Sequence, residues 1–138
     1  METILSLQNV TKKYKNFTLD HVSFDIPRGM ILGLMGENGA GKTTTIQSIL
    51  DLIKTDSGTI EIFGKDHCKD AKEIKQKLGV IMDGLNQNSY LKCGDLDKIL
   101  GKIYRSWDSQ RFFSYLDQFK LPREKKIKEL SKGMNVKL

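Results

Sequence analysis

The sequence has no apolar stretch long enough to cross a bilayer, and its first residues do not have the pattern of a secretory leader. Its longest apolar run, Met30 to Met35, is interrupted by Gly33, whereas a transmembrane helix needs about 20 apolar residues. The N-terminus METILSLQNV lacks the charged segment and apolar core of a signal peptide. These absences favour a cytosolic protein. With 138 residues, 38% of them hydrophobic and 29% charged, the chain has the size and composition of one globular domain.

The sequence is also poor in residues that bind transition metals. Cys68 and Cys93 lie in polar stretches without CxxC or Cys/His ligand spacing, and His21 and His67 have no second ligand at helical spacing. We therefore expect two free thiols and no metal site at these residues. The net charge is +6, and much of the excess lies in residues 121–138. A solvated helical face accounts for that run, so no nucleic-acid partner is expected.

Alternating apolar residues predict strands in the N-terminal half. ILSLQNV and FTLDHVSFDI read as half-exposed antiparallel strands, with a bulge or bend at Asp20-His21 where the alternation slips. TIEIF alternates in the same way. MILGLM (30–35) and GVIM (79–82) are apolar on both faces, which is typical of strands in a parallel sheet covered by helices. The fold class is therefore α/β.

Helical periodicity alternates with these strands. Ile46, Ile49, Leu50 and Ile53 recur at the spacing of an amphipathic helix, and Ala71, Ile74 and Leu78 form a second apolar stripe.

From Gly84 onward the sequence reads as helical. A stripe from Leu96 to Trp107 predicts one helix, and Asp108 is a good N-cap for the next. Trp107 before that cap is placed to meet Phe112 as a hydrophobic staple. The second helix should end at Leu121-Pro122.

GENGAGKT, Gly36 to Thr43, fits the P-loop pattern G-x-x-x-x-G-K-[ST] between a predicted strand and a predicted helix. Glycines let successive amides point at one anion, and the helix N-terminus adds partial positive charge. Lys42 would reach the β- and γ-phosphates as the catalytic lysine, and the Thr43 hydroxyl would bind Mg²⁺. The pattern predicts nucleoside triphosphate binding, and the absence of Asn-Lys-x-Asp argues against a guanine-specific GTPase. The predicted binding residues are Gly36, Glu37, Asn38, Gly39, Ala40, Gly41, Lys42, Thr43 and Thr44.

Nearly the whole chain resembles the ATP-binding cassette (ABC) transporter ATPases. GENGAGKTTT looks like their Walker A segment, DSGTIEIFGKD like the segment after the Walker A helix, and LGVIMDG like the stretch that ends at the Q-loop. LSKGM resembles the signature sequence. The segment from YRSWD to that signature resembles a bacterial exporter branch of the family.

The resemblance implies an ATPase with a partial RecA-like P-loop core and two accessory parts. Residues 1–30 and 57–65 would form an antiparallel β-subdomain, 30–56 and 66–83 the core, and 84–138 a helical subdomain that carries the signature. It also implies that Tyr14 stacks on adenine, an interaction suited to an electron-rich ring.

The signature would act in trans. In the family two such domains pack head to tail, so Ser131, Lys132, Gly133 and Met134 would face ATP held by the P-loop of a homodimeric or paired ABC subunit. Ser131 would also be an N-cap. Lys132 and Met134 replace the glycine and glutamine that are commoner at these positions in the family. The replacement removes polar contacts and adds a cation near the triphosphate.

Asp83 stands where the family has the Q-loop glutamine. A carboxylate there would hold Mg²⁺ through water or polarise the attacking water, and an ordinary aspartate at the end of a strand is an equal alternative. The Walker B strand, catalytic Glu, D-loop and switch His of the family are not found in these 138 residues. We therefore expect the chain alone to bind nucleotide without hydrolysing it, and its incomplete sheet to lower its stability or to cause association.

The expected function is that of the ATP-binding subunit of an ABC exporter. It would lie in the cytoplasm, peripheral on the inner face of the membrane, and would couple ATP-driven closure to a separate permease subunit. Two alternatives stay open: a soluble ABC protein that acts on the ribosome, and a nucleotide-binding module that does not hydrolyse ATP.

Overall fold

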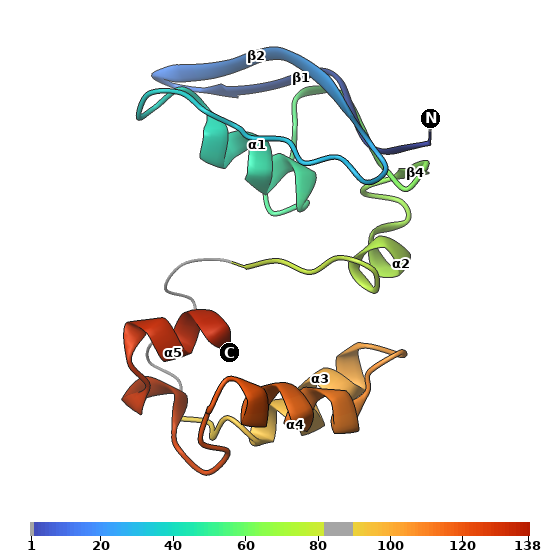
Figure 1. The fold of residues 1–138 in the computed structure, drawn as a ribbon. Helices are drawn as coiled ribbons and strands as arrows, with labels where there is room; N and C mark the ends of the chain where they lie inside the picture. Colours follow the sequence, from blue (N-terminus) through green and yellow to red (C-terminus); the bar gives the residue numbers. More distant parts are fainter. Residues whose placement is uncertain (1, 82–89) are drawn as a thin grey trace. The chain divides into compact units, whose positions relative to one another are not determined.

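The computed structural model describes residues 2–81 and 90–138 of the chain (Figure 1). The chain divides into two compact units, residues 1–77 and 78–138. No helix among the described residues is long and apolar enough to span a membrane.

The first unit is built on a four-stranded antiparallel sheet. Its strands are β1 (Thr3–Tyr14), β2 (Phe17–Pro27), β3 (Ser57–Ile62) and β4 (Lys65–Asp66), in the order β2-β1-β3-β4. The antiparallel strands predicted from the alternating patterns are thus confirmed. Its buried apolar residues are Leu7, Val10, Leu19, Ile60 and Ile62. Ile60 and Ile62 alternate along β3 as a one-sided core requires, and the pairing of β1 is irregular between Leu7 and Val10.

The predicted bulge at Asp20-His21 is present. Val10 pairs with Val22, but Lys12 pairs with Leu19, so between these pairs β2 has one more residue than β1. His21, one of the residues between these pairs, has a left-handed backbone with φ 47°. The slip keeps Leu19 on the buried face, which explains the phase change in the sequence.

The helix predicted after the P-loop is α1 (Lys42–Ile49), but its buried face is not the apolar stripe. Thr45 and Ser48 are buried, whereas Ile46 is exposed. Figure 1 shows α1 beneath the β1–β2 hairpin. Small side chains on the facing side let a helix lie close to a sheet, and the two hydroxyls are satisfied by carbonyls one turn back, those of Gly41 and Thr44. The periodicity thus located the helix correctly. Of the apolar stripe, Ile49, Leu50 and Ile53 are half-buried and Ile46 is exposed.

The parallel strands predicted at 30–35 and 79–82 are not formed in the described residues. Residues 30–35 have no strand assignment, and Ile31 and Met35 are 100% and 91% exposed. Ile81 is also exposed, and Met82 lies outside the described residues. A parallel strand obtains its hydrogen bonds only from neighbouring strands, and within the described residues neither segment has such a neighbour. The second predicted helical stripe forms only the short helix α2 (Ala71–Lys75), with Ile74 buried.

The second unit contains α3 (Asp95–Ile103), α4 (Ser109–Gln118), the 3-10 turn η1 (Ile127–Glu129) and α5 (Lys132–Lys137). The predicted cap and staple of α4 are confirmed. The Asp108 carboxylate accepts a hydrogen bond from the Arg111 amide at 2.9 Å, and the rings of Trp107 and Phe112 have centroids 5.2 Å apart.

Cys93 is part of the core of the second unit. It is fully buried with Ile127 and Leu130, which corrects the polar surroundings predicted for it. The polar neighbours in its sequence misled the prediction, because the Lys125 carbonyl that accepts the thiol hydrogen bond comes from a distant segment. Both cysteines are free thiols, as predicted.

Candidate functional site

The loop from Gly36 to Gly41 turns the chain into α1. Gly39 and Gly41 have φ angles of 88° and 97°, a left-handed region that side chains disfavour. The Ala40 amide donates to the Glu37 carbonyl at 3.2 Å and closes the turn. Gly41 is needed for a second reason, since a Cβ there would lie 2.8 Å from Leu19 Cδ1 and 3.0 Å from Phe17 Cζ.

The N-terminus of α1 is left open for an anion. Its N-cap is Gly41, which supplies no side-chain hydrogen bond, and no acidic residue lies in the first turn. The first hydrogen bond of the helix is donated by the Thr45 amide to the Gly41 carbonyl, at 2.8 Å. The amides before it have no intrahelical acceptor, so the partial positive charge of the helix end is available to a ligand.

Lys42 is held against the same loop. Its Nζ donates to the carbonyls of Gly36 and Glu37, each at 2.7 Å. The ammonium group is therefore positioned by the backbone of the loop. Carbonyl oxygens are neutral acceptors, so a charged phosphate oxygen would make a stronger hydrogen bond with this group.

A cavity of about 450 Å³ opens at this loop, a size typical of small-molecule sites. The lining residues come from the P-loop, the start of α1 and the turn between β1 and β2: Asn16, Phe17, Asn38, Gly39, Gly41, Lys42, Thr43 and Thr44. Sequence reasoning missed Asn16 and Phe17. The sequence signal that could have indicated them is the tight turn after Tyr14, because this turn brings the end of the β1–β2 hairpin to the P-loop.

Tyr14 lies beside the cavity and is not among the described residues that line it. Its ring stacks with Phe17 at a centroid distance of 6.3 Å and is 46% exposed. Lys12 Nζ lies 5.7 Å from the ring centroid. The two aromatic rings thus form a continuous surface from the cavity wall to solvent.

The predicted signature residues lie in the second unit. Ser131 is the N-cap of α5, and its hydroxyl accepts from the Met134 amide at 3.2 Å, so its predicted capping role is confirmed. Lys132 and Gly133 are exposed, whereas the Met134 side chain packs against the cluster of Cys93, Ile127 and Leu130. Asp83, predicted at the Q-loop position, lies outside the described residues.

The comparison with known families decides which P-loop protein this is. The ABC transporter family profile matches residues 19–138. The chain belongs to the ABC transporter family. This ABC sequence is 45% identical over 84 residues to the bacitracin transport ATP-binding protein BcrA of Bacillus licheniformis, a match that covers 60% of this chain and 28% of BcrA. It is 30% identical to BcrA of Enterococcus faecalis, covering 100% of this chain and 46% of that protein.

Solved ABC proteins share the fold. One, described as an ATP-binding subunit of an ABC transporter, matches with a TM-score of 0.83 and 25% identity over 97% of this chain and 58% of its own. Another, a dimeric ATP-binding cassette in a post-hydrolysis state with bound ADP and phosphate, matches with a TM-score of 0.76 and 25% identity, covering 96% of this chain and 66% of its own. The chain thus has the ABC fold in part, and it spans less than half the length of the two BcrA relatives.

Proposed function

We propose that this chain provides the ATP-binding face of an ABC exporter and that the whole protein hydrolyses ATP to drive transport. The observation that carries the proposal is the cavity in which Lys42, the open N-terminus of α1 and the P-loop glycines meet. These groups supply an ammonium, unpartnered amides and space for close approach of backbone to phosphate.

The base would bind at the aromatic end of the cavity. Phe17 lines it and stacks with Tyr14, so adenine would lie against one or both rings. The phosphates would then extend toward Lys42, Gly39 and the first turn of α1. Glu37 and Ala40 would act through the loop backbone, as the Glu37 carbonyl does in holding Lys42.

The cavity suits a phosphate-bound Mg²⁺. Thr43 is exposed and lines the cavity, whereas the hydroxyls of Thr45 and Ser48 are occupied by helix carbonyls. Thr43 would hold the ion, with Asp83 as a second proposed ligand. When bound with ATP, Mg²⁺ offsets negative charge on the phosphates.

The partner assignments rest on family membership and on the relatives. A second ABC subunit would present Ser131, Lys132 and the Gly133 amide to the nucleotide in trans, and a solved relative is a dimer with bound ADP and phosphate. The packing of Met134 against Cys93 and Ile127 favours a structural role for its side chain. A separate permease and a place on the inner face of the membrane are proposed because the BcrA relatives are described as transport ATP-binding proteins.

Equilibrium titration of the 138-residue chain with a fluorescent ATP analogue and Mg²⁺ tests the proposal. Lys42→Ala should weaken binding by about 10-fold or more, because a charge-assisted hydrogen bond contributes roughly 1.5–3 kcal/mol. Lys69→Ala removes an exposed lysine of the same unit that does not line the cavity, and should bind as the unsubstituted chain does.

Two further variants separate the parts of the site. Thr43→Ala should reduce the gain in affinity that Mg²⁺ produces while sparing metal-free binding. Phe17→Leu should weaken binding of the ATP analogue, because the adenine loses its aromatic contact, and should leave the affinity for inorganic triphosphate unchanged. Equal affinities for Lys42→Ala and Lys69→Ala would refute the assignment of this cavity.

A further inference from the structure

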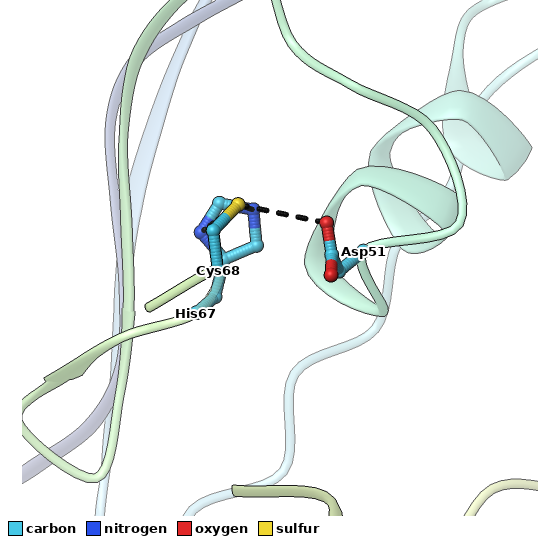
Figure 2. A group of neighbouring side chains, drawn as sticks. All are labelled: Asp51, His67 and Cys68. Carbon is cyan, nitrogen blue, oxygen red and sulfur yellow. Dashed lines mark hydrogen bonds between the residues drawn. The ribbon is translucent and has the colours of Figure 1, made fainter. Parts of the chain in front are cut away.

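A second group of ligating side chains lies in the first unit at the end of α1 opposite the P-loop. Asp51, His67 and Cys68 place one carboxylate oxygen, one imidazole nitrogen and one sulfur within 4.8 Å of one another. Figure 2 shows the three side chains converging from the end of α1 and the segment after β4. Cys68 Sγ lies 3.5 Å from Asp51 Oδ1 and 3.4 Å from His67 Nε2.

These separations match the edges of a tetrahedral zinc site. With zinc about 2.3 Å from sulfur and about 2.0–2.1 Å from nitrogen or oxygen, tetrahedral angles place the ligand atoms roughly 3.5 Å apart. The two distances from sulfur are within about 0.2 Å of that value, and the third, between the imidazole nitrogen and the carboxylate oxygen, is at most 4.8 Å. Because Cys68 Sγ also lies 3.8 Å from His67 Nδ1, the sulfur stands over the ring, and the Cys68 side chain must rotate before Sγ and Nε2 can ligate the same ion.

The imidazole of His67 is held by a backbone carbonyl. Its Nδ1 lies 3.2 Å from the Ile60 carbonyl, which can only accept, so Nδ1 carries the proton and Nε2 keeps its lone pair. His67 is 9% exposed, so the ring has little freedom to turn away. A histidine that donates one nitrogen to a backbone carbonyl and offers the other to a metal is the usual arrangement at zinc sites.

The backbone fixes the other two ligands. Asp51 follows α1 with φ 55° and its amide donates to the Ser48 carbonyl, while the Leu52 amide donates to Gln47. This is a Schellman ending in which a carboxylate occupies the position that glycine usually takes. The Asp66 carboxylate accepts from the amides of Cys68 and Lys69, each at 3.0 Å, and so holds the thiol-bearing turn.

The charges around the cluster leave one carboxylate oxygen available. Lys75 Nζ lies 3.7 Å from Asp51 Oδ2, while Oδ1 faces the thiol. A metal ligand must be a thiolate, so the Cys68 thiol would release its proton as the ion binds.

We propose that Asp51, His67 and Cys68 bind a divalent transition-metal ion, with Zn²⁺ as the best match and water as the fourth ligand. Mixed S, N and O donors in a tetrahedral arrangement favour zinc over Mg²⁺ or Ca²⁺, which require oxygen ligands. The bound ion would link the end of the P-loop helix to the segment after β4 and stabilise the first unit. The sequence hides this site, because Asp51 is brought to the adjacent His67 and Cys68 only by the folded sheet and helix.

Titration of the metal-free, reduced 138-residue chain with Zn²⁺ and Co²⁺ tests the proposal. One equivalent should bind, and Co²⁺ should give a thiolate-to-metal charge-transfer band together with the intense visible absorption of a tetrahedral ion. Cys68→Ser, His67→Gln and Asp51→Asn should each weaken binding by at least about 10-fold, since losing even an outer partner of a metal ligand costs 10–100-fold. Asn tolerates the left-handed backbone at position 51, so that variant keeps the helix ending.

Matched controls exclude binding elsewhere. Cys93→Ser removes the other thiol, and His21→Gln removes a histidine that pairs with Asp20 at 2.6 Å without a thiol nearby. Both should bind metal as the unsubstituted chain does, and Zn²⁺ should raise the melting temperature of both. Absence of the cobalt charge-transfer band, or a band that survives Cys68→Ser and disappears with Cys93→Ser, would overturn the proposal.

Discussion

Gly39 and Gly41 both have a left-handed backbone, but their surroundings differ. Around Gly39 nothing lies within 4 Å of where a Cβ would be, whereas at Gly41 the same atom would meet Leu19 and Phe17. Conformation alone therefore disfavours a side chain at Gly39, and conformation and packing both disfavour one at Gly41. Gly39 is thus required by the conformation of the loop, whereas Gly41 is also required by the contact between α1 and the β1–β2 hairpin.

We expect Gly39→Ala to lower the free energy of unfolding of the first unit by about 1–2 kcal/mol, the usual penalty for a left-handed alanine. Gly41→Ala should lower it by about 2–5 kcal/mol, since overpacking adds roughly 1–3 kcal/mol. Hydrogen exchange of the β1 and β2 amides measures the difference in that unit. Equal effects of the two substitutions would show that the hairpin does not rest on Gly41.

Residue-scale signals account for what could be predicted well. The cap at Asp108 with its Trp107 staple, and the cap at Ser131, depend on neighbours a few positions away in the sequence. The same holds for the geometry of the P-loop. The cluster of Asp51, His67 and Cys68 was missed because its members meet only through tertiary structure.

At the scale of elements, α3 is joined to the residues before α4 by a partly buried hydrogen bond beside an aromatic cluster. Trp107 Nε1 donates to Asp97 Oδ1 at 2.8 Å, and the Trp107 ring lies against Gly101 and Phe112. Hydrogen bonds from Trp107 and Ser109 lower the pKa of Asp97 below its ordinary value of 3.8. A bond from α3 to the residue before α4 therefore depends on a carboxylate being ionised.

This contact predicts an acid-dependent stability for the second unit. Because the folded state lowers the pKa of Asp97, the unfolded chain binds its proton first as pH falls. The stabilisation is complete above about pH 5 and is lost as pH falls through 3.8 toward the lower pKa of the folded state. Trp107 is the only tryptophan, so urea unfolding followed by its fluorescence measures this unit directly.

Asp97→Asn is the control for the acid effect, because the amide can still accept from Trp107 but does not titrate. We expect the variant to be less stable than the unsubstituted chain at pH 7 and to lose less stability between pH 5 and 3. Identical pH profiles would show that other carboxylates govern the acid response.

The same scale shows where prediction from sequence fails. The apolar segment 30–35 has the composition of a buried parallel strand, yet it is exposed because composition supplies no pairing partner. The stripe that includes Ile46 has helical period, yet α1 buries Thr45 and Ser48 instead. Period identifies the type of an element, whereas its buried face depends on which other elements are present to cover it.

For the molecule as a whole, these exposed apolar side chains set its behaviour in solution. Ile31 and Met35 are 100% and 91% exposed, so they add almost nothing to the packing of the first unit. Burying such a side chain is favourable by roughly 1.5–3 kcal/mol. A second copy of the chain, or a hydrophobic dye, can supply the surface that buries them.

We therefore expect the 138-residue chain to bind a hydrophobic dye and to self-associate as its concentration rises, as measured by light scattering coupled to size-exclusion chromatography. The double substitution Ile31→Ser and Met35→Ser should reduce both effects while leaving hydrogen exchange in β1 and β2 unchanged, because neither side chain is packed. Val136→Ser, at an apolar residue that is 59% exposed in the second unit, is the matched control and should have a smaller effect. Undiminished dye binding or association in the double variant would mean that the 30–35 segment is not the surface through which the chain associates. A loss of protection in β1 and β2 would instead show that these two side chains are packed in solution, so that the segment supports the hairpin.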